Sequence, residues 1–227
     1  MCGRCTFRPT AAVYERFEVR DRLDALVPRY HSAPGQMVPV SMANSPRRIV
    51  CMRWGVMPHW ATDEKTAYNM IHARVETRTQ RPAFRGLLSH HRCLVPANGF
   101  YEWQGEGRDK TPSSLYPAEQ SDLAFTGLDD VWITATGEAL STLTIITTAA
   151  DLFMARLHNR MPLILARERE EAWLDLQLTQ AQEVLDVLSR SPGLELDTYP
   201  IARMVHRPSV DSELLIQRVE SQASPLF

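Results

Sequence analysis

The chain has 227 residues, 44% of them hydrophobic, and a formal net charge of −2 at pH 7. This length is enough to bury one sizeable core, and the near-neutral charge excludes a uniformly basic nucleic-acid binder. The sequence shows neither a signal peptide nor a membrane-spanning apolar run, and its four cysteines are too few for a disulfide scaffold of this size. We therefore expect a soluble, cytoplasmic protein.

Charge is distributed unevenly along the chain. Residues 1–100 carry 15 Lys and Arg against 7 Asp and Glu, whereas residues 101–227 carry 10 against 20. Almost all of the positive charge in the first part is arginine, whose planar guanidinium suits bidentate phosphate contacts and stacking on bases. A polyanionic partner explains this pattern. A compositional bias of the genome also explains the choice of arginine over lysine, but it does not explain the asymmetry between the two parts of the chain.

The expected elements are short and mostly β. A helix is predicted over Thr10 to Val19, with Thr10 as its N-cap. Runs bounded by Gly, Pro or Asn predict strands over Met37 to Met42, Arg48 to Trp54, Arg92 to Pro96, Phe100 to Trp103, Leu123 to Leu128 and Leu143 to Thr147. Helical spacing of apolar residues predicts helices over Ala149 to Leu157, Glu168 to Leu178 and Gln180 to Leu188, and a short last helix over Asp211 to Val219. We expect a single α+β domain over residues 1–227, with a curled, mixed β-sheet (a pseudo-barrel) and peripheral helices.

The chain begins with Met1-Cys2-Gly3-Arg4. Removal of Met1, which the small Cys2 side chain permits, would leave an α-amine and a thiol on adjacent carbons. Such an aminothiol condenses with an aldehyde, because the amine forms an imine and the thiol then closes a five-membered thiazolidine. The same pair also suits an N-terminal nucleophile for peptide bonds, with its own amine as the base. Cys2 and Cys5 form a Cys-x-x-Cys, but a second pair at zinc-site spacing is missing, so we predict no metal site.

The segment from His72 to Thr77 concentrates phosphate-binding and reactive groups. If it is extended, His72, Arg74 and Glu76 share one face, and the carboxylate can orient the cation. A solvated polar strand face is the ordinary alternative.

Two later segments each place an ionisable group among apolar residues. In Asn98 to Trp103, Glu102 lies between two aromatic residues, which should make it harder to ionise and suits general acid–base catalysis. In Leu157 to Leu165, His158 precedes a buried-looking strand. Taken alone, each also fits an ordinary role, as a surface glutamate and as a core or capping histidine.

Together these segments resemble the SOS response-associated peptidase family, also known as the abasic-site processing proteins. The resemblance runs in order along residues 2 to about 165. Its motifs are Met1-Cys2-Gly3-Arg4, Ala33-Pro34-Gly35-Gln36, Arg53-Trp54-Gly55 with Pro58 and Trp60-Ala61, Ala73-Arg74-Val75-Glu76-Thr77, Arg92 to Trp103, and His158-Asn159-Arg160-Met161-Pro162.

The resemblance implies covalent capture of abasic sites in single-stranded DNA. Cys2 would form a thiazolidine with the C1 aldehyde of the ring-opened sugar, Glu102 would shuttle protons, and His158 would assist sugar opening or crosslink reversal. The DNA contacts that it implies include two phosphate-binding arginines, a wedge or stacking surface, and a threonine near the site: Arg4, Arg74, Pro34, Trp60, Trp103 and Thr147.

Three positions depart from the family's usual pattern. His72 and His31 stand where the family usually has Asn, and Cys5 stands where it tends to have an aromatic residue. Cys5 could compete as a thiol or pair oxidatively with Cys2. Histidine titrates near neutral pH and asparagine does not. We therefore expect His72 to retain a catalytic polar contact but to make crosslinking depend on pH.

The expected partner is single-stranded DNA that contains abasic sites. We expect the protein to bind it as a monomer during the DNA damage response, and to be associated with the bacterial nucleoid while it is bound to DNA. Neither a metal nor an organic cofactor is expected, because imine and thiazolidine formation require only proton transfers. Two alternatives remain open: a thiol peptidase that acts on its own N-terminus, and a noncovalent reader of modified DNA that uses arginines and tryptophans alone.

Overall fold

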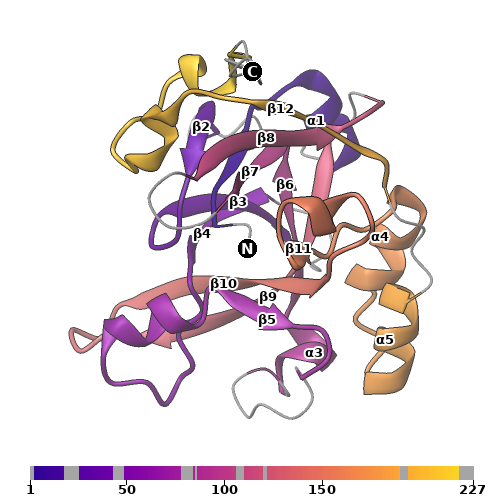
Figure 1. Cartoon of the computed structure of the whole chain (residues 1–227). Helices are drawn as coiled ribbons and strands as arrows, with labels where there is room; N and C mark the ends of the chain where they lie inside the picture. Colours follow the sequence, from indigo (N-terminus) through magenta and orange to yellow (C-terminus); the bar gives the residue numbers. More distant parts are fainter. Residues whose placement is uncertain are drawn as a thin grey trace, which may run out of the picture.

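The computed structural model describes residues 3–17, 26–42, 49–77, 84, 86–105, 110–119, 122–189 and 194–219. The fold is mixed α+β, and its strands form two sheets (Figure 1). The first sheet contains β1 (Cys5–Phe7), β2 (Arg29–Ser32), β7 (Gly99–Gln104), β8 (Thr111–Pro117) and β12 (Leu196–Pro200), in the order β12-β8-β7-β1-β2.

The second sheet closes on itself. It contains β3 (Met37–Met42), β4 (Ile49–Trp54), β5 (His72–Arg74), β6 (Arg92–Ala97), β9 (Leu123–Ile133), β10 (Ala139–Ala149) and β11 (Arg160–Pro162). Because β9 pairs with both β6 and β10, the strands β10, β4, β3, β6 and β9 form a ring. The sheet is mixed, since β4 and β5 run parallel to β10 and the other pairs are antiparallel. The predicted pseudo-barrel is thus confirmed.

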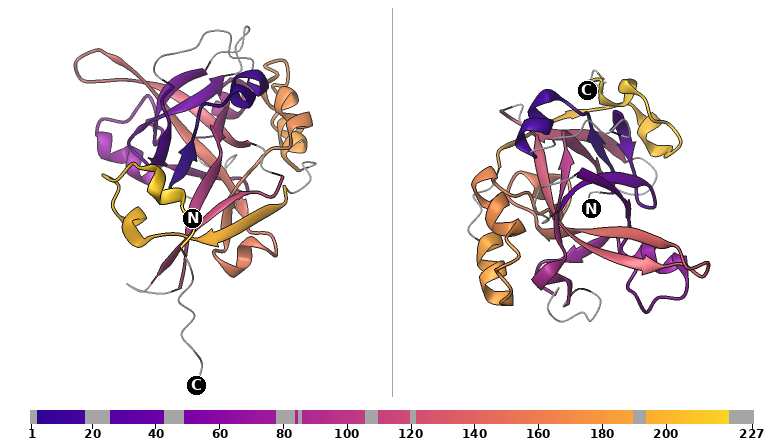
Figure 2. Two further views of the ribbon diagram at one scale, coloured as in Figure 1. Left: turned by 90° about the horizontal axis from the view of Figure 1, so that it is seen from above. Right: turned by 180° about the vertical axis from the view of Figure 1, so that it is seen from behind.

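The helical elements lie at the periphery, as expected (Figures 1 and 2). They are the α-helices α1 (Ala11–Arg16), α3 (Leu87–His90), α4 (Arg167–Leu174) and α5 (Ala181–Ser189), and the 3₁₀ helices η1 (Glu64–Asn69), η2 (Met154–Arg156), η3 (Arg203–His206) and η4 (Glu213–Ile216). The Thr10 hydroxyl accepts the N–H of Val13 at 3.3 Å, which confirms the predicted N-cap of α1. Within the described residues, none of the helices has the length and apolar character to span a bilayer.

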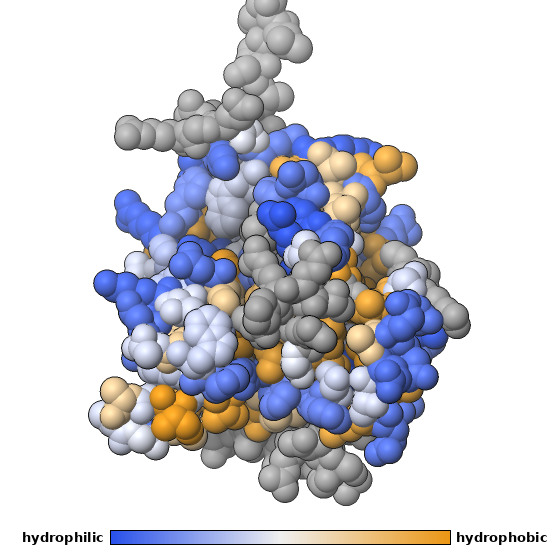
Figure 3. All heavy atoms as spheres, turned by 90° about the horizontal axis from the view of Figure 1, so that it is seen from below, coloured by the Kyte–Doolittle hydropathy of each residue, from blue (hydrophilic) through white to orange (hydrophobic). Residues whose placement is uncertain are grey.

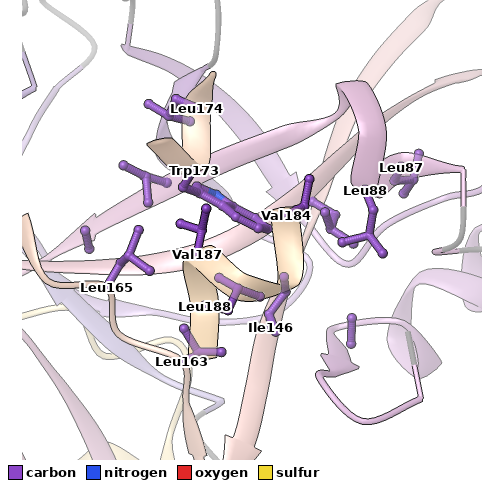
Figure 4. Close-up of a cluster of buried hydrophobic side chains, with 14 of the residues drawn as sticks. Leu87, Leu88, Ile146, Leu163, Leu165, Trp173, Leu174, Val184, Val187 and Leu188 are labelled. Atoms are coloured by element: carbon purple, nitrogen blue, oxygen red, sulfur yellow. The ribbon is translucent and has the colours of Figure 1, made fainter. Parts of the chain in front are cut away.

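Two large apolar clusters hold these layers together. In the first core cluster, Trp173 of α4 and Val184 and Leu188 of α5 pack over Ile146 of β10 and Leu88 of α3 (Figure 4). The second core cluster combines side chains from all five barrel strands with four from the first sheet: Cys5, Phe100, Leu115 and Leu196. Burial of apolar side chains at this scale is the main force that fixes the barrel against the first sheet.

The predicted helix over Ala149 to Leu157 is wrong. β10 extends to Ala149 because Thr147, Thr148 and Ala149 pair with β11, and only a 3₁₀ turn follows at Met154–Arg156. The Asp151 carboxylate accepts the Met154 N–H at 2.7 Å and starts that turn. The last predicted helix is likewise a 3₁₀ turn, η4, within the range expected.

Candidate functional site

Strand β5 places His72 and Arg74 on one face beside β10. In the parallel ladder, His72 lies opposite Ile145 and Arg74 opposite Thr147. Ala73, between them, belongs to the first core cluster, so His72 and Arg74 face the other side of the strand. The His72 ring is half-buried and meets Trp54 edge-on, with centroids 6.2 Å apart, whereas Arg74 is exposed.

Arg160 joins this strand to the end of β10. Its Nη1 and Nη2 donate to the two carboxylate oxygens of Glu76 at 2.7 and 3.0 Å, and Nη2 also donates to the Thr147 carbonyl at 2.7 Å and hydroxyl at 3.1 Å. The hydrogen bond from Arg160 lowers the pKa of Glu76. The expectation that Glu76 orients Arg74 is therefore wrong. β5 ends at Arg74, and the turn that follows directs Glu76 to Arg160.

His158 has a defined tautomer. His158 Nδ1 lies 2.9 Å from the backbone nitrogen of Arg160 and 3.3 Å from the Arg160 carbonyl oxygen; the shorter contact, in which Nδ1 accepts the N–H, places the hydrogen of the neutral ring on Nε2. The His158 backbone N–H in turn donates to the Met154 carbonyl at 2.9 Å, which ties the histidine to η2. We name His72, Arg74, Thr147, His158 and Arg160 the rim cluster, because all five lie around the end of β10 and its partners β5 and β11.

Strand β7 brings a buried carboxylate toward the same loop. Glu102 is 2% exposed and shares a strand face with Phe100, a member of the second core cluster. At the end of β7, the Gln104 amide donates to the Arg156 carbonyl at 3.2 Å, so this strand meets the loop that carries His158. Trp103 lies on the opposite face of β7, where it stacks on His206 with ring centroids 6.0 Å apart. The structure thus does not bring Trp103 to the face that carries Glu102.

The N-terminal segment runs alongside β7. Cys5 pairs with Phe100, and the Tyr101 N–H donates to the Arg4 carbonyl at 3.0 Å, so the residues before β1 continue antiparallel to β7 toward Glu102. Cys2 itself lies outside the described residues.

Cys5 is a poor competitor for an aldehyde. It is 2% exposed, and burial raises its pKa from 9.0 to about 12. The thiolate is the nucleophilic form of cysteine, so the expected competition by Cys5 is wrong at neutral pH.

Pro34 precedes Gly35, which is hydrogen-bonded to Trp54, and the ring of Trp54 contacts His72. The Gly35 N–H donates to the Trp54 carbonyl at 2.7 Å, and Gly35 has a φ of 86°, which favours glycine. A Cβ at Gly35 would lie 3.7 Å from the ring of Tyr68, whose side chain is 60% exposed. Sequence reasoning missed Tyr68 because a single tyrosine in a polar turn has no pattern.

Trp60 lies farther along the barrel. Its side chain is 55% exposed, and its neighbour Ala61 accepts the indole N–H of Trp132 at 2.7 Å. Trp132 pairs with Leu140 of β10. Leu140 precedes Thr147 by seven residues, which corresponds to about 23 Å along a strand. Trp60 is therefore not part of the rim cluster.

One face of the molecule is mostly hydrophilic, with separate hydrophobic patches (Figure 3). A hollow of about 570 Å³ lies on the outer side of the first sheet, and its walls include Arg8, Asn98, Tyr116 and Tyr199. That hollow contains none of the predicted site residues. Among the described residues, we find no group of three or more His, Cys, Asp or Glu side chains placed to hold a metal ion.

Comparisons with known proteins agree on one family. The family model described as SOS response associated peptidase (SRAP) matches residues 1–208. The chain is 35% identical to the abasic site processing protein YoaM of Bacillus subtilis, over 95% of this chain and 97% of that protein. It is 27% identical to YedK of Escherichia coli, also named an abasic site processing protein, over 96% of this chain and 100% of YedK. A crystal structure of a protein from Bacteroides thetaiotaomicron superposes with a TM-score of 0.82 at 26% identity, covering 96% of this chain and 100% of that one.

Proposed function

The chain belongs to the SOS response associated peptidase family, and from this membership and the geometry of its site we propose that it processes abasic sites in single-stranded DNA by covalent capture. Abasic-site processing is the activity named in its relatives. The observation that carries the finer proposal is the course of the N-terminal segment. Gly3 and Arg4 run beside β7 toward the buried Glu102, and Cys2 is the residue that precedes them in the sequence.

Apart from attack by the amine and the thiol of Cys2, the capture reaction needs only proton transfers. After Met1 is removed, the Cys2 amine attacks the C1 aldehyde of the open sugar and water leaves, which gives an imine. The thiol sulfur then adds to the imine carbon and its proton goes to the nitrogen, which gives the thiazolidine. One water is lost in total, and nothing is oxidised or reduced.

Buried and hydrogen-bonded groups supply the proton transfers in this proposal. Glu102 gives a proton to the departing water and takes protons from the attacking amine, as a positioned general acid–base does. His158, with its hydrogen on Nε2, donates to the sugar oxygen as the ring opens. His72 offers a polar contact beside Trp54.

Other predicted site residues bind the DNA strand on either side of the lesion. Arg4 and Arg74 contact the phosphates that flank the lesion, because guanidinium groups match phosphate in geometry and charge. Pro34 contacts an unstacked base next to the lesion together with Tyr68, whose ring is exposed beside Gly35, and Trp60 contacts a base farther along the DNA.

A denaturing gel tests the proposal. Protein is incubated with single-stranded DNA that contains one abasic site, beside Cys2→Ala, Glu102→Gln and a control, Glu119→Gln, which changes an exposed carboxylate. We expect a shifted band from wild type and Glu119→Gln, none from Cys2→Ala, and a much slower reaction from Glu102→Gln. Intact mass shows whether Met1 is absent from the preparation. A wild-type preparation without Met1 that gives no shifted band refutes covalent capture.

The same preparations distinguish the two alternatives. Loss of Met1 from wild type but not from Cys2→Ala, in cells that lack methionine aminopeptidase activity toward it, supports self-processing by a cysteine-type peptidase. A noncovalent reader is supported if Cys2→Ala still binds DNA in a native gel while the denaturing gel shows no crosslink from wild type.

A further inference from the structure

His31 connects the N-terminal segment to the C-terminal segment, which we define as residues 203–219. The ring is buried, with 0% exposure, at β2. Its Nε2 lies 3.0 Å from Arg4 Nε, and its Nδ1 lies 2.8 Å from the Val210 carbonyl oxygen. β2 and the C-terminal segment lie side by side at one end of the molecule (Figures 1 and 2).

These two contacts define the protonation state of His31. A guanidinium only donates hydrogen bonds, and a carbonyl only accepts them. The ring must therefore accept from Arg4 at Nε2 and donate to Val210 from Nδ1. Only the neutral ring with its hydrogen on Nδ1 does both.

Several charged and titratable groups surround the ring. Arg4 faces it from the N-terminal segment, Arg29 from β2, and Asp211 from the C-terminal segment, and the Tyr101 ring of β7 meets it edge-on at 6.2 Å. The Asp211 carboxylate accepts hydrogen bonds from residues of β2. One carboxylate oxygen accepts the backbone N–H of Tyr30 at 2.6 Å and of His31 at 3.0 Å, and the other accepts Arg29 Nε at 2.5 Å.

The balance of these groups favours the neutral ring. Burial lowers the pKa of His31, and the cations Arg4 and Arg29 act in the same direction, against the Val210 carbonyl and Asp211, which raise it. Protonation would put an N–H donor at His31 Nε2 opposite the N–H donor of Arg4, and a positive charge beside the positive guanidinium. The hydrogen bond between Arg4 and His31 cannot survive that change.

We propose that His31 is a positioning residue, which holds the Arg4 guanidinium through a neutral ring and so couples the C-terminal segment to the residues that follow Cys2 in the sequence. Arg4 lies two residues after Cys2, and its Nη1 also donates to the Gly3 carbonyl at 2.7 Å. Fixing this side chain fixes both a phosphate contact and the backbone next to the aminothiol. Acid releases Arg4. This role rests on the proposed capture function.

The test compares crosslinking rates of wild type, His31→Gln, His31→Leu and a control, His90→Gln, which changes an exposed histidine at the end of α3. Gln offers an acceptor and a donor and does not titrate, whereas Leu offers neither. At about pH 7.5 we expect His31→Gln within about twofold of wild type and His31→Leu about tenfold slower, because a misplacement of about 1 Å can cost about 100-fold. The salt dependence of His31→Leu should also be weaker, because a phosphate contact is lost.

Two further measurements separate positioning from a merely structural effect. The ratio of wild-type to His31→Gln rates cancels the pH dependence of the imine chemistry, and we expect this ratio to stay constant above pH 6.5 and to fall as the pH is lowered below that value and His31 protonates. Nitrogen-15 spectra of the wild-type imidazole should show the Nδ1–H tautomer at neutral pH.

Three results overturn the positioning role while leaving covalent capture intact: a constant rate ratio, an Nε2–H tautomer at neutral pH, or wild-type rate and salt dependence in a folded His31→Leu protein. If wild type forms no crosslink at any pH, covalent capture itself is refuted, which distinguishes the two failures.

Discussion

Replacement of Arg160 by Lys tests whether one guanidinium holds the rim cluster together. Arg160 makes four side-chain hydrogen bonds, two to Glu76 and two to Thr147. Its side chain is 14% exposed, and that of Glu76 is 46% exposed. A lysine ammonium is a single point donor without the fork of a guanidinium, so Arg160→Lys keeps the charge but cannot reproduce this geometry.

The expected cost follows from the exposure of each partner. Hydrogen bonds from a charged donor contribute about 1.5–3 kcal/mol each when shielded, which applies to the buried Thr147. The ion pair with the half-exposed Glu76 is screened by solvent and contributes about 0.2–1 kcal/mol. Both Thr147 contacts are made by the same Nη2, so together they count as about one such hydrogen bond. Arg160→Lys should therefore lower the free energy of unfolding by about 2–4 kcal/mol, and Glu76→Gln by about 1 kcal/mol or less.

Urea unfolding measures both costs. The effect of Glu76 also has a predicted pH dependence. Because its native pKa lies below the unfolded value of 4.5, its contribution is complete above that value and is lost as the pH falls through the native pKa. Equal costs for Arg160→Lys and Glu76→Gln, or a cost below about 1 kcal/mol for Arg160→Lys, would refute the assigned geometry.

Four further substitutions probe separate features. Glu102→Gln should slow crosslinking by about 100-fold to 10,000-fold at an unchanged thermal midpoint, and a loss below about tenfold contradicts a proton-transfer role. Arg92→Leu removes five hydrogen bonds to main-chain carbonyls and should lower the free energy of unfolding by about 3–5 kcal/mol in urea. Cys5 ionises near pH 9.0 when unfolded and near 12 when native, so the folded state retains its proton and stability falls as the pH rises above 9.0. Cys5→Ala should lose less stability than wild type in reducing buffer, by about 1 kcal/mol between pH 9 and 10. His72→Asn should flatten crosslinking between about pH 5.5 and 7.5, and identical profiles for the two proteins contradict the expected titration.

Local patterns predicted the barrel strands well and the segment after β10 poorly. The strand over Met37 to Met42 matches β3 at both ends, because its apolar residues and flanking turn residues agree. After β10, the spacing of Leu152, Phe153 and Leu157 is equally typical of a helix. Leu152 is nevertheless 91% exposed in the structure. Pairing with β11, which depends on residues 11 to 15 positions later, keeps the chain extended to Ala149, and no local pattern reports that pairing.

The same limit applies to the site. The sequence placed His72 and Arg74 on one face, and the β5 ladder confirms this, because alternation is a local property of a strand. It did not identify the partner of Glu76, since Arg160 lies 84 residues away. His31 was noticed only as a departure from a family motif. Its contacts with Arg4 and Val210 span 27 and 179 residues, so they are visible only in the folded chain.

The structure also changes the meaning of the charge asymmetry. Arginines of the positive part pair with the acidic part inside the protein: Arg16 bonds Glu170, and Arg29 bonds Asp211. Arg92 is buried against main-chain carbonyls and is equally unavailable to a ligand. Part of the asymmetry therefore reports how the two parts of the chain hold each other. The argument for a polyanionic partner rests instead on where cations remain at the surface, and Arg74, exposed beside Thr147 in the rim cluster, carries more of that argument than the total charge does.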